Sequence, residues 1–238
     1  MEKLLDPLIP NFQKSLTEWS AVEDSLKNGK TALLVIDLQY LDADPNLGIF
    51  RDLEKHNIPI EATDYYFYQL NKVVLPNVKK LQEAFRKRGL EVIHTRIQSL
   101  TQDGRDRSPV HKQLDLIATP GSKEAEFLPE VAPVGDEIVI NKTASGVFSS
   151  TNLQYVLRNL EVTGLVVVGV YTSECVSTTV RHGCDLGFYM TLISDACASV
   201  TPELQRSTIE TLKDRYAGVL KTNDFIYKLE ELLDNKKS

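Results

Sequence analysis

The sequence lacks the features that mark membrane and secreted proteins. Among its 238 residues, no apolar run approaches the roughly 18–20 residues that a membrane-spanning helix needs. Residues 1–30 contain acids and prolines where a secretory signal peptide would have an uninterrupted apolar core. We therefore expect a cytoplasmic protein that has no membrane partner.

Basic residues are fewer than acidic residues. The chain has 27 Lys and Arg residues against 33 Asp and Glu residues, which gives a formal net charge of −6 at pH 7. The basic residues are scattered among acids and form no stripe of the kind that binds a phosphate backbone. We expect no nucleic-acid partner.

Cysteine and histidine are few and dispersed. Three cysteines cannot all pair within one chain, and neither residue type shows the close spacing of a metal site. This usage fits a reducing compartment. No Gly-x-Gly-x-x-Gly pattern follows the first apolar run, which argues against a dinucleotide. The sequence thus predicts no metal and no cofactor. The residues concerned are Cys175, Cys184, Cys197, His56, His94, His111 and His182.

What the chain does have is a regular alternation of short apolar runs with amphipathic segments. Hydrophobic residues make up 42% and charged residues 25%, which is ordinary globular usage. The alternation predicts a three-layer αβα fold, Rossmann-like, with a six-stranded, mostly parallel, doubly wound sheet. The predicted strands are residues 31–36, 90–95, 137–140, 165–168, 188–193 and 218–222.

The pattern is continuous enough to predict one domain over residues 31–238. Residues 1–30 are mixed and weakly periodic. We interpret them as an N-terminal arm laid over the domain or over a neighbouring subunit, with a partly mobile tail as the alternative. Residues 40–64 form a long acidic stretch directly after the first strand, and loops of this length are often functional.

Three polar residues stand where predicted strands end: Asp37, Lys142 and Cys175. Because ligands of open parallel sheets bind beyond the carboxyl ends of the strands, we expect the three side chains to converge. Cys175 stands at a strand-to-helix turn, where unpaired N–H groups favour thiolate over thiol. A neighbouring cation would favour the thiolate further, and a carboxylate could carry protons.

Each of the three also has a simpler interpretation. Cys175 could be a buried cysteine packed under a helix. Asp37 could merely cap a turn, and Lys142 could be a solvated surface lysine.

The sequence around these residues resembles the isochorismatase-like cysteine hydrolases. The resemblance lies in Val-Ile-Asp-Leu-Gln around Asp37, in Asn-Lys-Thr-Ala-Ser-Gly around Lys142, and in Gly-Val-Tyr-Thr-Ser-Glu-Cys-Val-Ser-Thr-Thr-Val-Arg around Cys175, and it covers roughly residues 31–220. It implies an Asp–Lys–Cys triad that hydrolyses the C–N bond of a small amide, carbamoyl or ureido substrate.

The resemblance implies further features. One is a cis peptide bond between Val170 and Tyr171, and another is an oxyanion hole made by the backbone N–H groups of Tyr171 and Cys175. A third is a homodimer or homotetramer. As substrate-binding candidates we name Gln39, Arg96 and Phe148; Arg96 could hold a substrate carboxylate by bidentate contact.

Two departures narrow the function. The metal-dependent branch of the family carries Asp-x-His after its second strand, whereas this chain has His94-Thr-Arg-Ile-Gln. Members that hydrolyse isochorismate itself lack the cysteine, so Cys175 argues against vinyl-ether chemistry. A non-catalytic binding or regulatory module on the same fold is the other alternative, although such a module has no need of a complete triad.

We predict that no metal takes part in the chemistry, since the ligand pattern of the metal-dependent branch is missing. Exhaustive chelation should leave the turnover rate of the purified protein unchanged. A loss of activity that zinc or iron restores would contradict the prediction.

Overall fold

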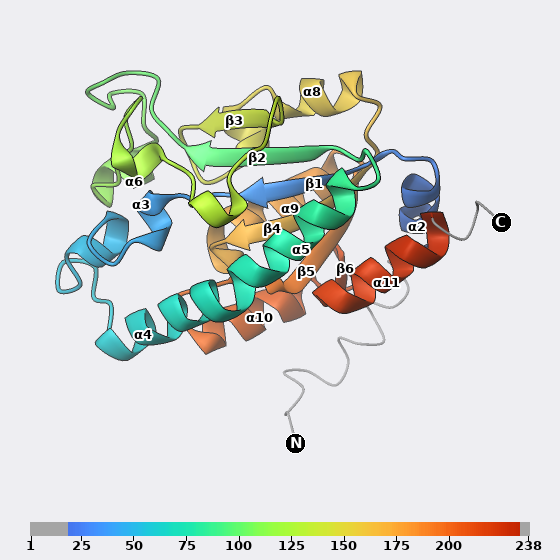
Figure 1. The fold of residues 1–238 in the computed structure, drawn as a ribbon. Coiled ribbons are helices and arrows are strands. Elements are labelled where there is room, and N and C mark those ends of the chain that lie inside the picture. The colour runs from blue at the N-terminus through green and yellow to red at the C-terminus, as the bar shows by residue number, and fades with distance from the viewer. Residues whose placement is uncertain (1–18, 234–238) are drawn as a thin grey trace.

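One parallel sheet of six strands organises the chain (Figure 1). The computed structural model describes residues 19–233. All five strand pairings are parallel, in the order β3-β2-β1-β4-β5-β6, so the sheet is more uniform than the mostly parallel one predicted. The strands are β1 (Thr31–Ile36), β2 (Val92–Ile97), β3 (Ile138–Lys142), β4 (Gly164–Val170), β5 (Tyr189–Ala198) and β6 (Gly218–Leu220).

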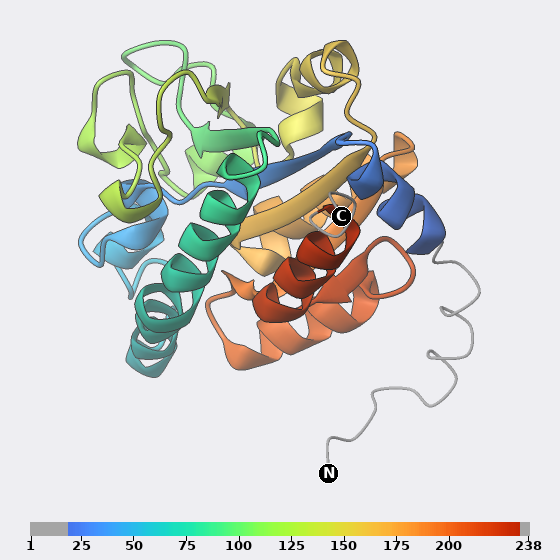
Figure 2. The same cartoon turned by 45° about the vertical axis from the view of Figure 1, so that its right-hand side comes forward.

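Helices cover both faces of the sheet, as the three-layer prediction requires (Figures 1 and 2). Alternation along β1 explains the two cores: Leu33 and Val35 pack with α5 and α11, while Leu34 and Ile36 pack with α8 and α9. The longer helices are α2 (Trp19–Lys27), α4 (Ile60–Gln69), α5 (Leu75–Arg86), α8 (Leu153–Asn159), α9 (Ser177–Asp185), α10 (Pro202–Leu212) and α11 (Thr222–Leu233).

The stretch after β1 is more ordered than its irregular sequence indicated. It contains α3 (Tyr40–Ala43), a 3-10 turn (Gly48–Arg51) and the start of α4. A π-helical turn (Leu70–Val74) then joins α4 to α5 without a break. α5 begins at Leu75, so Pro76 stands in its first turn, where the missing N–H is tolerated.

The strand after the cysteine helix is also longer than predicted. β5 runs for ten residues with a register shift against β4 between Val167 and Gly169. Cys197 consequently lies inside β5, paired with Gly169, whereas the predicted strand ended at residue 193. Because of this register shift, β5 continues to pair with β4 beyond the end of its apolar run.

Helix α2 belongs to the stretch that we predicted as an arm. Leu26 packs in the same core as β1, and Ser25 lies 2.8 Å from Thr31 between their hydroxyl oxygens. The domain boundary at residue 30 stays a prediction, and residues 1–18 lie outside the described part of the chain. Within residues 19–233, no helix has the length and apolar character needed to cross a bilayer.

The strand order reverses between β1 and β4, which pair directly. At such a point the connections leave to opposite sides, which opens a crevice beyond the carboxyl ends of the two strands. In Figure 1 these ends point left, toward α3 and α6 (Pro109–Gln113). The fold thus places the ends of β1 and β4 beside a crevice.

Gly169 allows β4 to approach β1 at this crevice. Its φ is +117°, and a Cβ built there would fall on backbone atoms of Ile36, the residue before Asp37. We predict that Gly169→Ala lowers the free energy of unfolding by about 3 kcal/mol, because neither backbone can give way. Denaturant unfolding measures the change.

Gly89→Ala is the matched control. Gly89 also has positive φ, +64°, but a Cβ there would meet open space. The control should lose only the backbone strain of about 1–2 kcal/mol. Equal losses in the two variants would mean that the contact with Ile36 contributes nothing.

Candidate active site

The structure brings Asp37, Lys142 and Cys175 together. The Lys142 ammonium lies 2.8 Å from the Asp37 Oδ2 atom and 3.3 Å from the Cys175 Sγ atom. All three residues are buried, Asp37 and Lys142 completely. Lys142 also donates to the Ala144 carbonyl at 3.0 Å, so its ammonium is in contact with three partners. The alternative that Lys142 is a solvated surface lysine is wrong.

Asp37 is held by the neighbouring strand. Its N–H donates to the Thr95 carbonyl at 3.1 Å, and the Thr95 hydroxyl donates to its Oδ1 atom at 3.0 Å. Its φ of +53° lies in the left-handed region, which aspartate tolerates better than most residues. This geometry leaves Oδ2 for Lys142, so one carboxylate is fixed from both sides.

Cys175 lies in a π-helical turn (Thr172–Val176) that leads directly into α9. Sequence reasoning expected the first turn of an α-helix there. Within the π-helical turn, the N–H groups of Glu174 and Val176 both donate to the Tyr171 carbonyl. The Val170–Tyr171 peptide bond is cis, at the position that the family resemblance implied. Single π-helical turns occur frequently at functional sites.

The charge balance at the thiol differs from the one that we expected. Burial raises the pKa of Cys175 well above its usual range, Lys142 opposes this shift, and Asp37 and Asp42 reinforce it. For Lys142, burial alone would lower the pKa, but the negative charges of Asp37 and Cys175 raise it above its usual value. Position beside a helix start therefore does not by itself make this thiol a thiolate.

A pocket of about 230 Å³ opens above Cys175. Most of its wall is aliphatic, and its polar residues come from several loops and turns. The residues lining it are Asp42, Ile49, His56, Ile58, Ile97, Val110, His111, Leu114, Leu116, Ser145, Tyr171, Glu174, Cys175 and Val200.

The three substrate-binding candidates lie elsewhere. Gln39 is fully buried, and its carboxamide bonds the backbone of Ile97 and Glu124, at 2.6–2.9 Å. Arg96 bonds the Asn141 side chain and the Ala125 carbonyl. Phe148 stacks on Phe188 in the core, with ring centroids 5.7 Å apart. None of these candidates lines the pocket above Cys175, because each is committed to a structural contact.

Sequence reasoning missed several polar residues of this pocket. Asp42 lies in the acidic stretch after β1, whose length marked it as functional, but nothing singled out that residue. Glu174 directly precedes Cys175, so its place in the motif was the available signal. His111 gave none, since its neighbourhood in the sequence is irregular. Burial, with repulsion by Lys142, lowers the pKa of His111 to about 4, so it is neutral at pH 7.

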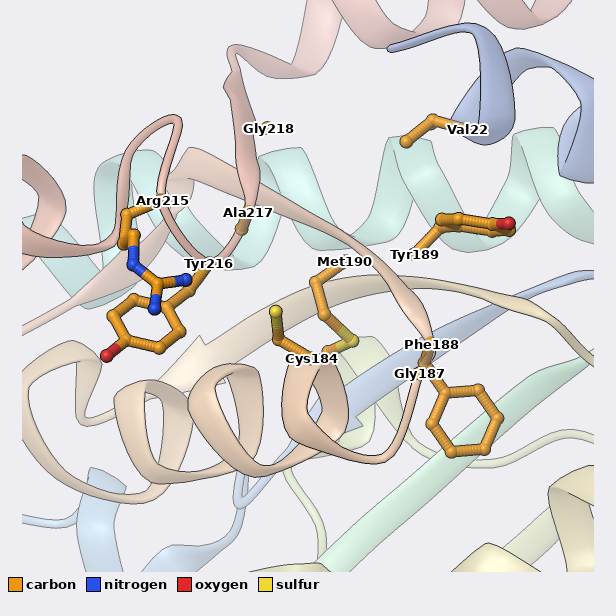
Figure 3. Close-up of a pocket in the computed structure, with 10 residues that line it drawn as sticks. All are labelled: Val22, Cys184, Gly187, Phe188, Tyr189, Met190, Arg215, Tyr216, Ala217 and Gly218. Carbon is orange, nitrogen blue, oxygen red and sulfur yellow. The ribbon is translucent and has the colours of Figure 1, made fainter. Parts of the chain in front are cut away.

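A second hollow, about 210 Å³, lies near the amino ends of β5 and β6 (Figure 3). It is lined by Tyr189 and Gly218, the residues at which β5 and β6 begin, and therefore faces away from Asp37 and Lys142. Cys184 lines this second hollow, with Arg215 and Tyr216 beside it. Cys184 is consequently separate from the pocket above Cys175.

Known proteins are similar to this chain in sequence or in fold. The uncharacterised isochorismatase family protein YrdC of Bacillus subtilis is 31% identical over 83% of this chain and 97% of its own length. Ureidoacrylate amidohydrolase RutB of Acinetobacter baylyi is 27% identical over 83% of this chain and 82% of its own.

The solved structure of a cysteine hydrolase from Pseudomonas syringae superposes with a TM-score of 0.71. It is 23% identical and covers 86% of this chain and 94% of that chain, a likeness that concerns the fold. The isochorismatase domain matches residues 55–224, which is most of the chain. The chain therefore belongs to the isochorismatase family.

Proposed function

We propose that this isochorismatase-family hydrolase uses Cys175 to cleave a C–N bond in a small amide, carbamoyl or ureido compound. One observation carries the proposal: a single buried ammonium, that of Lys142, contacts both a carboxylate and a thiol at the floor of a pocket. The similarity to a ureidoacrylate amidohydrolase supports the bond type.

In the first half of the reaction, the Cys175 thiol passes its proton to Asp37 as sulfur attacks the carbonyl carbon. Because burial raises the pKa of the thiol, transfer coupled to attack is favoured over a standing thiolate. The oxyanion would be received by the N–H groups of Tyr171 and Cys175. Asp37 then gives the proton to the leaving nitrogen, the C–N bond breaks, and ammonia or an amine departs.

The second half removes the acyl group from sulfur. A water molecule attacks the thioester and gives a proton to Asp37; the C–S bond breaks, and the proton returns to Cys175. Lys142 has a positioning role throughout, since its ammonium holds the Asp37 carboxylate in place and stabilises negative charge on sulfur. The homo-oligomeric assembly and the cytoplasmic location stay predictions.

Cys175→Ala should lower turnover of a panel of small amides and ureido compounds by about a thousandfold or more, because the nucleophile is removed. Ammonia release measures this, and circular dichroism checks the fold. Cys184→Ala is the matched control, and it should keep full activity because Cys184 lines the second hollow. Substantial turnover by Cys175→Ala would refute the mechanism; no turnover by wild type on any compound would favour a non-catalytic binding module.

Lys142→Met should shift the pH profile of Cys175 alkylation toward higher pH by about 1–3 pH units, since it deletes the positive charge 3.3 Å from sulfur that opposes the raised thiol pKa. The measurement is the alkylation rate by a small electrophile between pH 6 and 11. Lys142→Arg should restore the profile only in part, because a planar guanidinium does not fit the place of a compact ammonium. Coincident profiles for wild type and Lys142→Met would show that Lys142 does not act on the thiol.

A further inference from the structure

The wall of the pocket above Cys175 carries no positive charge. Within residues 19–233, neither lysine nor arginine lines it. Lys142 does not line the pocket, and its ammonium is already in contact with Asp37, Ala144 and Cys175. Binding of a substrate carboxylate normally relies on arginine or lysine, and this pocket offers neither.

Two arginines of the second strand and the loop after it, Arg96 and Arg107, are engaged in other contacts. Arg107 donates to the carbonyls of Gly104 and Leu116. Arg96, which we had named as a carboxylate ligand, donates to Asn141 and Ala125. Neither side chain lines the pocket.

Two carboxyl groups line the pocket, and they come from segments that are far apart in the sequence. Asp42 is 4% exposed and comes from α3, whereas Glu174 is exposed and directly precedes the nucleophile. Burial raises the pKa of Asp42 well above its usual value, and the negative charge of Asp37 adds to the shift. The protein packed around Glu174 also raises its pKa. The raised pKa values of Asp42 and Glu174 indicate that the pocket disfavours negative charge. The charged form of a substrate carboxylate would be destabilised there for the same reason.

Buried polar atoms without a hydrogen-bond partner show what the pocket does accept. Among the described residues that line the pocket, His111 Nδ1 is such an atom, whereas the Asp42 carboxyl and the Tyr171 hydroxyl interact with each other. Unpaired buried polar groups are costly, so a ligand that pairs them gains affinity. His111 is neutral at pH 7, because burial lowers its pKa to about 4. The N–H and carbonyl groups of an uncharged amide or urea match such partners.

We infer that the substrate of this site is a small amide or alkylurea with an aliphatic body and no carboxylate, because a carboxylate in this pocket would face the carboxyl groups of Asp42 and Glu174 and no cation. The inference rests on the proposed function for the bond that is cleaved. At about 230 Å³ the pocket is smaller than the roughly 300–1,000 Å³ of pockets that take drug-sized ligands, which fits a compact substrate.

The first test does not depend on turnover. Iodoacetamide and iodoacetate have the same shape and differ by one negative charge. We expect Cys175 to prefer iodoacetamide by about tenfold more than a free thiol such as N-acetylcysteine does. Peptide mass spectrometry resolves Cys175 from Cys184. A preference equal to or below that of the free thiol would overturn the inference.

Variants assign the effect to the two acids. Asp42→Asn and Glu174→Gln should each reduce the preference of Cys175 for iodoacetamide, while Glu130→Gln, an exposed acid away from the pocket, should leave it unchanged. Because Asp42 is buried, its variant also requires a check of the fold; Glu174 is exposed, so its variant tests the charge alone. Unchanged preference in a folded Asp42→Asn and in Glu174→Gln would refute the role of both acids.

The second test uses turnover of matched pairs. The pair 4-methylpentanamide and succinamate share a shape, as do 3-methylbutylurea and N-carbamoyl-β-alanine, and only the second of each pair is anionic. We expect kcat/KM to be at least about tenfold higher for the uncharged member. Preference for the anionic member would overturn the inference while supporting the proposed hydrolysis. Absence of turnover with all four would count against the proposed function, and the alkylation ratio would still decide the charge selectivity.

Discussion

The contact on which the rest of the site depends is that of the Lys142 ammonium with Asp37 and Cys175. Removing an ammonium and a carboxylate from water costs several kcal/mol per ion, and such a pair is tolerated only when its hydrogen-bonding groups are satisfied. Here the Lys142 ammonium also contacts the Ala144 carbonyl, and the Thr95 hydroxyl donates to the second oxygen of Asp37. These contacts therefore fix the positions of Asp37, Lys142 and Cys175 before any substrate binds.

The sheet supplies the rigidity that this arrangement needs. Asp37 follows β1, Lys142 ends β3, and Cys175 follows β4; β2, which carries Thr95, lies between β1 and β3. The reach from β3 to Asp37 crosses the end of β2, and only a long side chain spans that distance. Close approach of β4 to β1 at Gly169 brings Cys175 within reach of the same ammonium. The direct pairing of β1 with β4, where the strand order reverses, thus places the thiol of Cys175 beside the ammonium that contacts Asp37.

Sequence reasoning predicted most of this fold and part of the site, for identifiable reasons. Apolar runs locate strands well, and β1 has the bounds predicted for it. Convergence of Asp37, Lys142 and Cys175 followed from parallel strands ending at one edge. The contacts of individual side chains were not predictable in the same way. Gln39 and Asp42 are both polar residues shortly after β1, yet only the structure shows that the Gln39 carboxamide hydrogen-bonds the backbone of Ile97. The π-helical turns at 70–74 and 172–176 leave no periodic signal, and His111 reaches the pocket through irregular chain.

Burial gives the pocket a consistent electrostatic character. It raises the pKa of Cys175 and of Asp42, and the protein packed around the exposed Glu174 raises the pKa of that side chain as well, so these three groups are shifted toward their neutral forms. An uncharged substrate adds no charge on binding. Negative charge would then develop only as sulfur attacks, beside the ammonium of Lys142 and the N–H groups of Tyr171 and Cys175. Interactions that strengthen only at that stage lower the barrier without tightening binding of the ground state, which is the condition for faster turnover.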